Sequence, residues 1–328
     1  MYDGPIVSYV VTGALGCIGA WIVKALVARG DAVVMFDNQT DRHRLHAVFD
    51  DEAAAEAVPL VVGDLTDGAT VHRVLADHGA THVIHLAGLQ VPTCRANPAL
   101  GAMVNVVGTL HVFEAARALG LERVVYASSA AVFGVSEDDR PVAEDEADAP
   151  RTHYGWFKRT NEGNADIYSR DHGLSSVGLR PLTVYGVGRD TGVTSDTTEA
   201  LRHAVLGLPF HVRFGGTTDF LHVADCAAAF IACADRAPAG AHVFNLHGET
   251  APVLEFVRLA EEILPASARG LIRVDGPPIP IASSLSDAAL RRAVPGIPST
   301  DLRTGIAETL QRFTALRDRG WWSTQVHA

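Results

Sequence analysis

The sequence predicts an α/β chain with a doubly wound parallel sheet and a smaller C-terminal α/β lobe. In the first half, short runs rich in β-branched residues alternate with longer segments rich in Ala and Leu, and this alternation is typical of repeated βαβ units. The short runs are nearly continuous in apolar residues, which fits a sheet covered on both faces. After about residue 181 the rhythm changes, because Gly, Thr and Pro become more frequent.

The expected elements follow this alternation along the chain. In the first half we expect strands at 6–13, 32–38, 58–65, 82–88, 123–129 and 175–181. Between them we expect helices at 17–29, 69–78, 98–119 and 153–172. In the second half we expect short strands at 209–216 and 270–276, and helices near 195–207, 225–235, 252–264 and 301–316.

One later segment is predicted to return to the first sheet. The run "HVFNLHG" at 242–248 has the composition of a buried strand. We therefore expect a first domain at 1–180 and a substrate-binding lobe at 181–328. The two are expected to interleave, with part of 219–248 packing back on the first domain.

Composition narrows the function. The chain has 328 residues, 48% of them hydrophobic, and a formal net charge of -11, so it can bury a large core beneath an acidic surface. Such a surface works against nucleic acid or an anionic membrane as the main partner. We find no apolar run near the roughly 18 to 20 residues that a membrane span needs. A small soluble substrate is expected.

The cysteines and the N-terminus indicate a reducing compartment. The four cysteines are scattered, with no CxxC pair and no histidines at metal-ligand spacing, so neither a disulfide framework nor a metal site is expected. The first residues carry Asp3 in place of a basic leader and run directly into a glycine-rich turn. We therefore expect no signal peptide and a cytoplasmic protein.

The glycine-rich turn predicts a dinucleotide site. "VVTGALGCIGAW" places Gly13, Gly16 and Gly19 between the first strand and the first helix, where backbone N–H groups and the helix N-terminus can approach a pyrophosphate. Three glycines alone also fit a tight structural turn. Asp37 ends the second strand, near the spacing expected for a carboxylate that binds the adenosine ribose. Because a carboxylate would repel a 2′-phosphate, NAD is favoured over NADP.

In these motifs the chain resembles the extended short-chain dehydrogenase/reductase family, of the NAD-dependent epimerase/dehydratase type. "TGALGCIG" at 12–19, "GDL" at 63–65, "HLAG" at 85–88 and "NVVGT" at 105–109 occur in the order and spacing of that family. The resemblance implies a Rossmann-type fold for the first domain and bound NAD. The cofactor-binding residues that it implies are Gly13, Gly16, Cys17, Ile18, Gly19, Asp37, Asn38, Asp64, Leu65, Leu86, Ala87, Gly88, Asn105, Tyr154, Lys158 and Pro181.

Tyr154 and Lys158 form the candidate catalytic dyad. They lie four positions apart in the helix expected at 153–172, so they share one helical face. A bare YxxxK is usually a surface lysine beside a partly buried tyrosine, but here it follows a full cofactor pattern. Ser129 occupies the place of the family's catalytic hydroxyl. The ordinary pKa of a phenol is near 10, and we expect the charges of Lys158 and an oxidised nicotinamide to lower it, so that Tyr154 acts as a general base.

The resemblance also narrows the reaction. Family dehydratases usually carry acidic residues directly after the catalytic hydroxyl, where this chain has Ala130 and Ala131. Dehydration is therefore not expected. Epimerisation and net oxidation of a secondary alcohol both stay open. A catalytically silent NAD-binding regulatory protein is a third alternative, against which the presence of all three catalytic residues argues.

The substrate is expected to be a free sugar or sugar acid. Where many nucleotide-sugar enzymes of the family carry an Asn and an Arg, this chain has Thr183 and Thr218, so two handles for a nucleotide diphosphate are missing. The residues expected to orient a smaller substrate are Gln90, Ser129, Thr183 and Arg189. A nucleotide-sugar 4-epimerase is the alternative. The resemblance implies a homodimer formed by the helices at 98–119 and 153–172.

Overall fold

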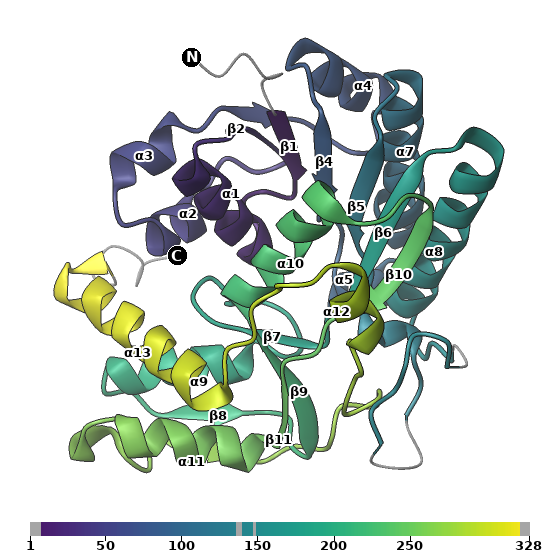
Figure 1. Cartoon of the computed structure of the whole chain (residues 1–328). Coiled ribbons are helices and arrows are strands. Elements are labelled where there is room, and N and C mark those ends of the chain that lie inside the picture. Colours follow the sequence, from purple (N-terminus) through teal and green to yellow (C-terminus); the bar gives the residue numbers. More distant parts are fainter. Residues whose placement is uncertain (1–7, 136–139, 147–148, 322–328) are drawn as a thin grey trace.

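The computed structural model describes residues 8–135, 140–146 and 149–321. Residues 1–7, on which part of the expected absence of a signal peptide depends, lie outside these ranges. The described part contains a large parallel sheet with helices on both faces, and a smaller group of strands and helices beside it (Figure 1).

The large sheet has seven parallel strands in the order β10-β6-β5-β4-β1-β2-β3. The predicted Rossmann-type doubly wound sheet is confirmed. The strand order reverses between β1 and β4, and ligands in such folds bind at this point, outside the carboxyl ends of the strands. The strands are β1 (Ser8–Thr12), β2 (Ala32–Asp37), β3 (Leu60–Val62), β4 (His82–His85), β5 (Arg123–Ala127), β6 (Ser175–Arg180) and β10 (Ala241–Asn245).

Two apolar clusters cover the two faces of this sheet. Val11 of β1 belongs to one cluster and its neighbour Val10 to the other, because successive side chains of a strand point to opposite faces. Helices α1 and α10 pack on the first face, and α4, α7 and α8 on the second (Figure 1). Their bounds are α1 (Cys17–Arg29), α4 (Gly68–Asp77), α7 (Gly108–Ala118), α8 (His153–His172) and α10 (Val223–Arg236).

One helical run contradicts the expectation about membrane spans. The short helix α6 (Pro98–Ala102), a π-helical turn at Met103–Val107 and α7 follow each other without a break. Within this 21-residue run, Pro98–Ala118, an 18-residue window has a mean hydropathy of 1.4, so the run is long and apolar enough to cross a membrane by length and composition. Burial explains part of this composition, because Val112 and Phe113 are fully enclosed in the second cluster, whereas Leu100 and Met103 are 44% and 46% exposed. Buried helices of soluble proteins have the same composition.

The smaller group of elements contains two short sheets. In the first, β7 (Thr183–Tyr185) runs parallel to β9 (Thr217–His222), and β11 (Glu249–Pro252) pairs antiparallel with β9. In the second, β8 (Phe210–Val212) pairs with β12 (Ile272–Val274). The strands β8 and β12 were predicted from the sequence, whereas β7, β9 and β11 were not. The helices here are α9 (Asp196–Val205), α11 (Val253–Ile263), α12 (Ala288–Ala293) and α13 (Leu302–Asp318).

Some segments after residue 181 belong to the large sheet. The strand expected at 242–248 is β10, which pairs in parallel with β6, and α10 packs against α1. The exact limits of the two domains stay a prediction. Three short helices of the first domain, which were not predicted, are α2 (His43–Val48), α3 (Glu52–Ala57) and α5 (Val91–Ala96).

A buried ion pair fastens α8 to the sheet. Arg180, at the end of β6, donates two hydrogen bonds of 2.7 Å to the carboxylate of Glu162 on α8, and both side chains are almost completely enclosed. Ser128, just beyond β5, donates to Glu162 Oε1 at 2.5 Å. Removing one partner of such a pair typically costs about 3 to 5 kcal/mol. The network therefore holds α8 firmly beside the ends of β5 and β6.

Candidate active site

A cavity of about 1460 Å³ opens at the carboxyl ends of the parallel strands. This is larger than the roughly 300–1,000 Å³ of an ordinary small-molecule site, so there is room for two ligands side by side. Segments that follow six strands of the large sheet, and others from the smaller lobe, contribute to its walls. The lining residues that bear on binding and chemistry include Gly13, Gly16, Asp37, Asp64, Ala87, Gln90, Ser129, Tyr154, Lys158 and Arg189.

The glycine-rich turn is shaped as a dinucleotide cradle. Gly13 has a φ of 68°, and a Cβ there would lie 2.6 Å from the backbone nitrogen of Ala87, so only glycine fits between β1 and β4. A Cβ on Gly19 would lie 2.4 Å from the carbonyl oxygen of Gly13. Gly16 precedes α1, and no side chain caps the helix there. The start of α1 lines the cavity, and its uncapped N–H groups can donate hydrogen bonds to an anionic pyrophosphate.

Asp37 lies at the end of β2 and lines the same cavity. Its carboxylate accepts hydrogen bonds from the backbone N–H groups of Leu15 at 3.0 Å and Gln39 at 3.1 Å. These bonds fix the acid beside the glycine-rich turn. Asp64 lines the next part of the wall and is oriented by the Thr66 N–H at 2.8 Å. The donor set and the glycine cradle fit NAD.

Most of the other expected cofactor residues share this wall. Asn105 is the exception, because it is buried and does not line the cavity. Its amide holds Leu89 instead, accepting from the Leu89 N–H at 2.6 Å and donating to the Leu89 carbonyl at 2.8 Å. It thus shapes the loop after β4 without touching a ligand. The lining residues are Cys17, Ile18, Asn38, Leu65, Leu86, Gly88 and Pro181.

Tyr154 and Lys158 lie in the first turns of α8. Thr152 starts this helix by accepting the Gly155 N–H at 3.0 Å, a capping bond that fixes where the helix begins. Lys158 Nζ donates to the carbonyl of Ala127, at the end of β5, at 2.6 Å. The same nitrogen lies 5.5 Å from the centre of the Tyr154 ring. Burial lowers the pKa of Lys158 to about 8.

Ser129 stands beside Tyr154. The two side chains are hydrogen-bonded, and Ser129 Oγ also accepts the Ala131 N–H at 3.1 Å. Burial raises the pKa of Tyr154, while the Ser129 hydrogen bond and the charge of Arg189 oppose that rise. In the protein without NAD the pKa of Tyr154 is therefore raised, because the desolvation of the phenol outweighs the opposing effects of the Ser129 hydrogen bond and the Arg189 charge. The expected lowering of this pKa by Lys158 together with an oxidised nicotinamide stays a prediction.

Thr183 was expected to bind the substrate, and the structure contradicts this. Thr183 is 0% exposed and Thr218 is 2% exposed, and their hydroxyl oxygens lie 2.8 Å apart in a mutual hydrogen bond. Thr183 does not line the cavity, whereas its neighbours Leu182 and Val184 do. The side chains alternate along β7, so Thr183 points away from the ligand space.

Gln90 and Arg189 do line the cavity. Arg189 donates from one terminal nitrogen to Thr194 at 3.2 Å. Its Nε is buried and has no hydrogen-bond partner within the part of the chain that the structure describes. Buried guanidinium donors are normally satisfied. An anionic or polar ligand group in the cavity would satisfy this one.

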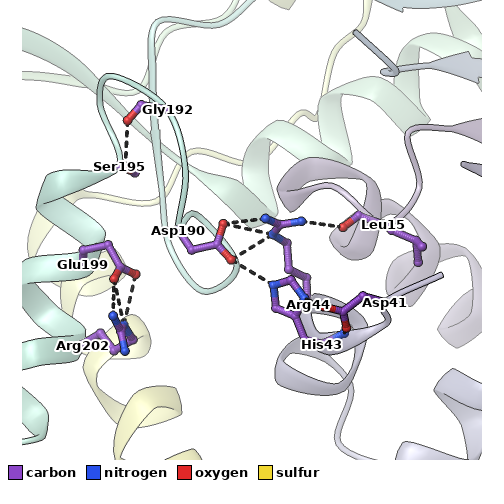
Figure 2. Close-up of polar contacts among 9 residues, drawn as sticks. All are labelled: Leu15, Asp41, His43, Arg44, Asp190, Gly192, Ser195, Glu199 and Arg202. Atoms are coloured by element: carbon purple, nitrogen blue, oxygen red, sulfur yellow. Dashed lines mark hydrogen bonds and ion pairs between the residues drawn. The ribbon is translucent and has the colours of Figure 1, made fainter. Parts of the chain in front are cut away.

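Two parts of the site were not predicted from the sequence. Asp41, His43 and Arg44, which follow β2, line the cavity, and their position after a parallel strand is a signal that could have found them. Figure 2 shows His43 and Arg44 contacting Asp190, which lies in the segment between β7 and α9. The segment at 279–281 also lines the cavity, and no motif in the sequence indicates it. Among the described residues, no group of three or more His, Cys, Asp or Glu is arranged to hold a metal ion.

The model of the NAD dependent epimerase/dehydratase family matches residues 9–246. The chain belongs to this family. UDP-glucuronate 4-epimerase 4 of Arabidopsis thaliana is 30% identical over 331 residues, which cover 94% of this chain and 75% of that protein.

Solved structures of epimerases and related proteins have the same fold as this chain. The UDP-glucose 4-epimerase of Thermus thermophilus in complex with NAD is 27% identical, with a TM-score of 0.80, covering 94% of this chain and 99% of that one. MoeE5 in complex with UDP-glucuronic acid and NAD is also 27% identical, with a TM-score of 0.79, covering 95% of this chain and 99% of that one. The present family member is accordingly an NAD-dependent enzyme.

The first prediction concerns cofactor choice. We expect tighter binding of NAD than of NADP, because the Asp37 carboxylate would repel a 2′-phosphate. The nearby cations are engaged elsewhere: Arg42 donates to the Ala55 carbonyl at 2.7 Å and Arg44 donates to Asp190. Asp37→Ala should reduce the difference in affinity between NAD and NADP, as measured by calorimetric titration. Asp51→Ala, at an exposed helix cap of the same domain, is the control and should leave it unchanged. A wild-type preference for NADP would refute the assignment.

Proposed function

We propose that this protein is an NAD-dependent 4-epimerase of UDP-linked sugars and that it prefers UDP-glucuronate to UDP-glucose. One observation carries the proposal. Tyr154, bonded to Ser129, lines the same cavity as the cation Arg189, whose Nε is unsatisfied in the described structure. A general base for a sugar hydroxyl and a fixed positive charge for an acid group thus belong to one site.

The proposal replaces the expected free sugar by a nucleotide sugar. That expectation depended on Thr183 and Thr218 as missing handles inside the site. Both side chains lie outside the cavity and satisfy each other, so they are poor indicators of what the cavity holds. The names of the relatives at 27% to 30% identity refer to UDP-sugars. The volume supports a substrate of that size beside the cofactor.

The chemistry follows from the positions of the side chains. Bound NAD supplies a hydride acceptor, and the same carrier can return the hydride. Tyr154 takes the proton from the sugar hydroxyl at carbon 4, and Ser129 holds the same oxygen by a hydrogen bond. Lys158, with its charge beside the phenol, favours the deprotonated tyrosine. The oxidised sugar then rotates in the cavity and presents its other face. When the hydride and the proton from Tyr154 return, the alcohol at carbon 4 has the opposite configuration.

Two features favour epimerisation over other outcomes. Ala130 and Ala131 follow Ser129 and begin a short 3₁₀ helix, so neither position offers the acid or base that elimination of water needs. The cavity is about 1460 Å³ and gives a sugar space to present its other face. A regulatory NAD-binding protein would need no base beside its cofactor.

The second prediction tests the base. Tyr154→Phe should lower kcat by about 10²- to 10⁴-fold, because the variant cannot take the proton. NAD affinity and the thermal midpoint should stay near those of the wild type. Tyr168→Phe is a matched control on the same helix. The Tyr168 hydroxyl donates a hydrogen bond of 2.6 Å to Glu114, and Tyr168 does not line the cavity. Turnover by Tyr154→Phe at the rate of that control would remove Tyr154 from the mechanism.

The third prediction tests the substrate. With UDP-glucuronate and UDP-glucose as substrates, wild-type kcat/KM should be higher for the acid. Arg189→Gln should lower kcat/KM for UDP-glucuronate by about 10- to 100-fold, the loss expected when a charge-assisted hydrogen bond of about 1.5 to 3 kcal/mol is removed. UDP-glucose should be affected much less.

Arg213→Gln is the control for this substitution. Arg213 is exposed and pairs with Asp196 at 2.6 Å, outside the cavity, so both activities should be retained. Equal losses on the two sugars in Arg189→Gln would contradict the preference for the acid. Turnover of free glucuronate, with none of either UDP-sugar, would restore the free-sugar alternative.

The fourth prediction concerns assembly. We infer a homodimer, because four large apolar side chains on the neighbouring elements α6, the π-turn and α8 are between 44% and 55% exposed. The elements that carry them contact one another, and large exposed apolar patches mark interaction sites. Light scattering should give twice the mass of the chain, and the monomer mass at micromolar concentration would reject the inference. The four residues are Leu100, Met103, Trp156 and Ile167.

A further inference from the structure

The loop between β7 and α9, residues 186–195, crosses from the smaller lobe to the glycine-rich turn. We call it the clasp loop. Gly186, Gly188 and Gly192 have φ values of 125°, 92° and 105°, conformations that other residues rarely adopt. The Arg189 N–H donates to the Gly186 carbonyl at 3.0 Å. The glycines therefore give this loop a tight path that carries Arg189 into the cavity.

The clasp loop lies directly against the cofactor-binding elements. Trp21 on α1 donates from its indole nitrogen to the Val187 carbonyl at 2.8 Å. A Cβ on Gly188 would lie 3.8 Å from the Cα of Cys17, the first residue of α1. The loop thus covers the start of α1, where the N–H groups of the cofactor cradle lie.

An ion pair fastens the tip of the loop. Arg44 donates from Nε to both carboxylate oxygens of Asp190, at 3.1 and 3.0 Å, and from a terminal nitrogen at 2.7 Å. His43 Nε2 lies 3.0 Å from the same carboxylate. In Figure 2, Asp190 faces Arg44 and His43 across the gap between the loop and α2. Burial opposes the charge, but hydrogen bonds from His43 and Arg44 lower the pKa of Asp190 to about 2.

Arg44 connects this pair to the cofactor turn. Its other terminal nitrogen donates to the carbonyl of Leu15 at 3.1 Å, as Figure 2 also shows. The N–H of Leu15 donates in turn to Asp37. A continuous chain of polar contacts therefore leads from the acid at the ribose end of the site to the carboxylate beside Arg189.

We propose that Asp190 is a positioning residue, which holds the clasp loop closed over the cofactor turn and keeps Arg189 directed into the cavity. Neither the smaller lobe nor the dinucleotide domain can place Arg189 alone, because the loop starts in one and is fastened to the other. NAD retention and substrate binding should therefore depend on the same ion pair. The part about NAD depends only on membership of the family, whereas the part about Arg189 rests on the proposed function.

The test compares full-length variants by three measurements. Asp190→Asn and Arg44→Gln each remove one side of the pair, and the double variant completes a cycle. Glu199→Gln is the matched control, because Glu199 pairs with Arg202 on α9 (Figure 2) and does not line the cavity. The measurements are the calorimetric Kd for NAD, hydrogen exchange of the amides at 187–194, and kcat and KM for UDP-glucuronate.

Each single variant should weaken NAD binding by about ten-fold, the scale of a partly buried charged pair, and should speed exchange in the clasp loop. The double variant should lose no more than the larger single loss, because both changes break one interaction. With UDP-glucuronate, Asp190→Asn should raise KM much more than it lowers kcat. Asp190→Glu, which keeps the charge, should recover part of the NAD affinity. The control should behave as the wild type.

The outcomes separate the two proposals. Unchanged NAD affinity and unchanged exchange in both single variants would overturn the clasp, as would losses that multiply in the double variant. If the wild type turns over no UDP-sugar, the proposed function fails, and the NAD and exchange measurements still decide the clasp. If Asp190→Asn lowers the thermal midpoint strongly, Arg44→Gln and Asp190→Glu supply the same comparison.

Discussion

The site depends on a lysine that the fold keeps almost entirely out of water. Lys158 is 6% exposed, and its ammonium donates to the Ala127 carbonyl at the end of β5. An unpaired buried ammonium would be costly, so the bond fixes α8 in rotation and in height against the sheet. The same helix carries Tyr154 one turn earlier, and Ser129 follows β5 by two residues. The base and its hydroxyl partner are thus positioned by one contact between a helix and a strand end, and the Glu162–Arg180 pair holds the rest of α8 in place.

The two halves of the chain divide the chemistry between them. The parallel sheet brings the glycine-rich turn, Asp37 and the candidate catalytic residues to one edge, because the carboxyl ends of parallel strands meet there. The smaller lobe contributes the cation Arg189 through a loop whose path requires the positive φ values of three glycines. A polar chain through Leu15, Arg44 and Asp190 joins these parts. Substrate recognition is therefore expected to respond to changes in residues that belong to the cofactor domain.

The sequence predicted what local spacing determines and failed where the direction of a side chain decides. Gly13 and Asp37 were found because a tight turn and a strand end leave a clear pattern. The segment around Thr183 does reach the cavity, as expected. However, neighbouring side chains point to opposite faces of β7, so Leu182 and Val184 line the cavity and Thr183 does not. Asn105 was similarly assigned to the cofactor, although its side-chain amide hydrogen-bonds the backbone of Leu89 instead.

Long-range contacts left still less signal. The pairing of Arg44 with Asp190 joins residues 146 positions apart, and nothing in either segment alone predicts it. Burial raises the pKa of Tyr154 in the protein without NAD, and this effect was not foreseen because charges can be counted in a sequence whereas burial cannot. The strands β7 and β11 were missed because they have only three and four residues and are bounded by Gly186 and Pro252. The longer strand β9 was also missed, and its partners in the small sheet are these two short strands.

We propose that the protein inverts a sugar alcohol by removing and returning the hydrogen of one carbon. The most direct measurement is the fate of deuterium placed at carbon 4 of UDP-glucuronate, followed by mass spectrometry of the epimerised sugar. We expect the product to keep its deuterium, and to take none from heavy water when unlabelled substrate is used. Exchange of that hydrogen with solvent during epimerisation would contradict it.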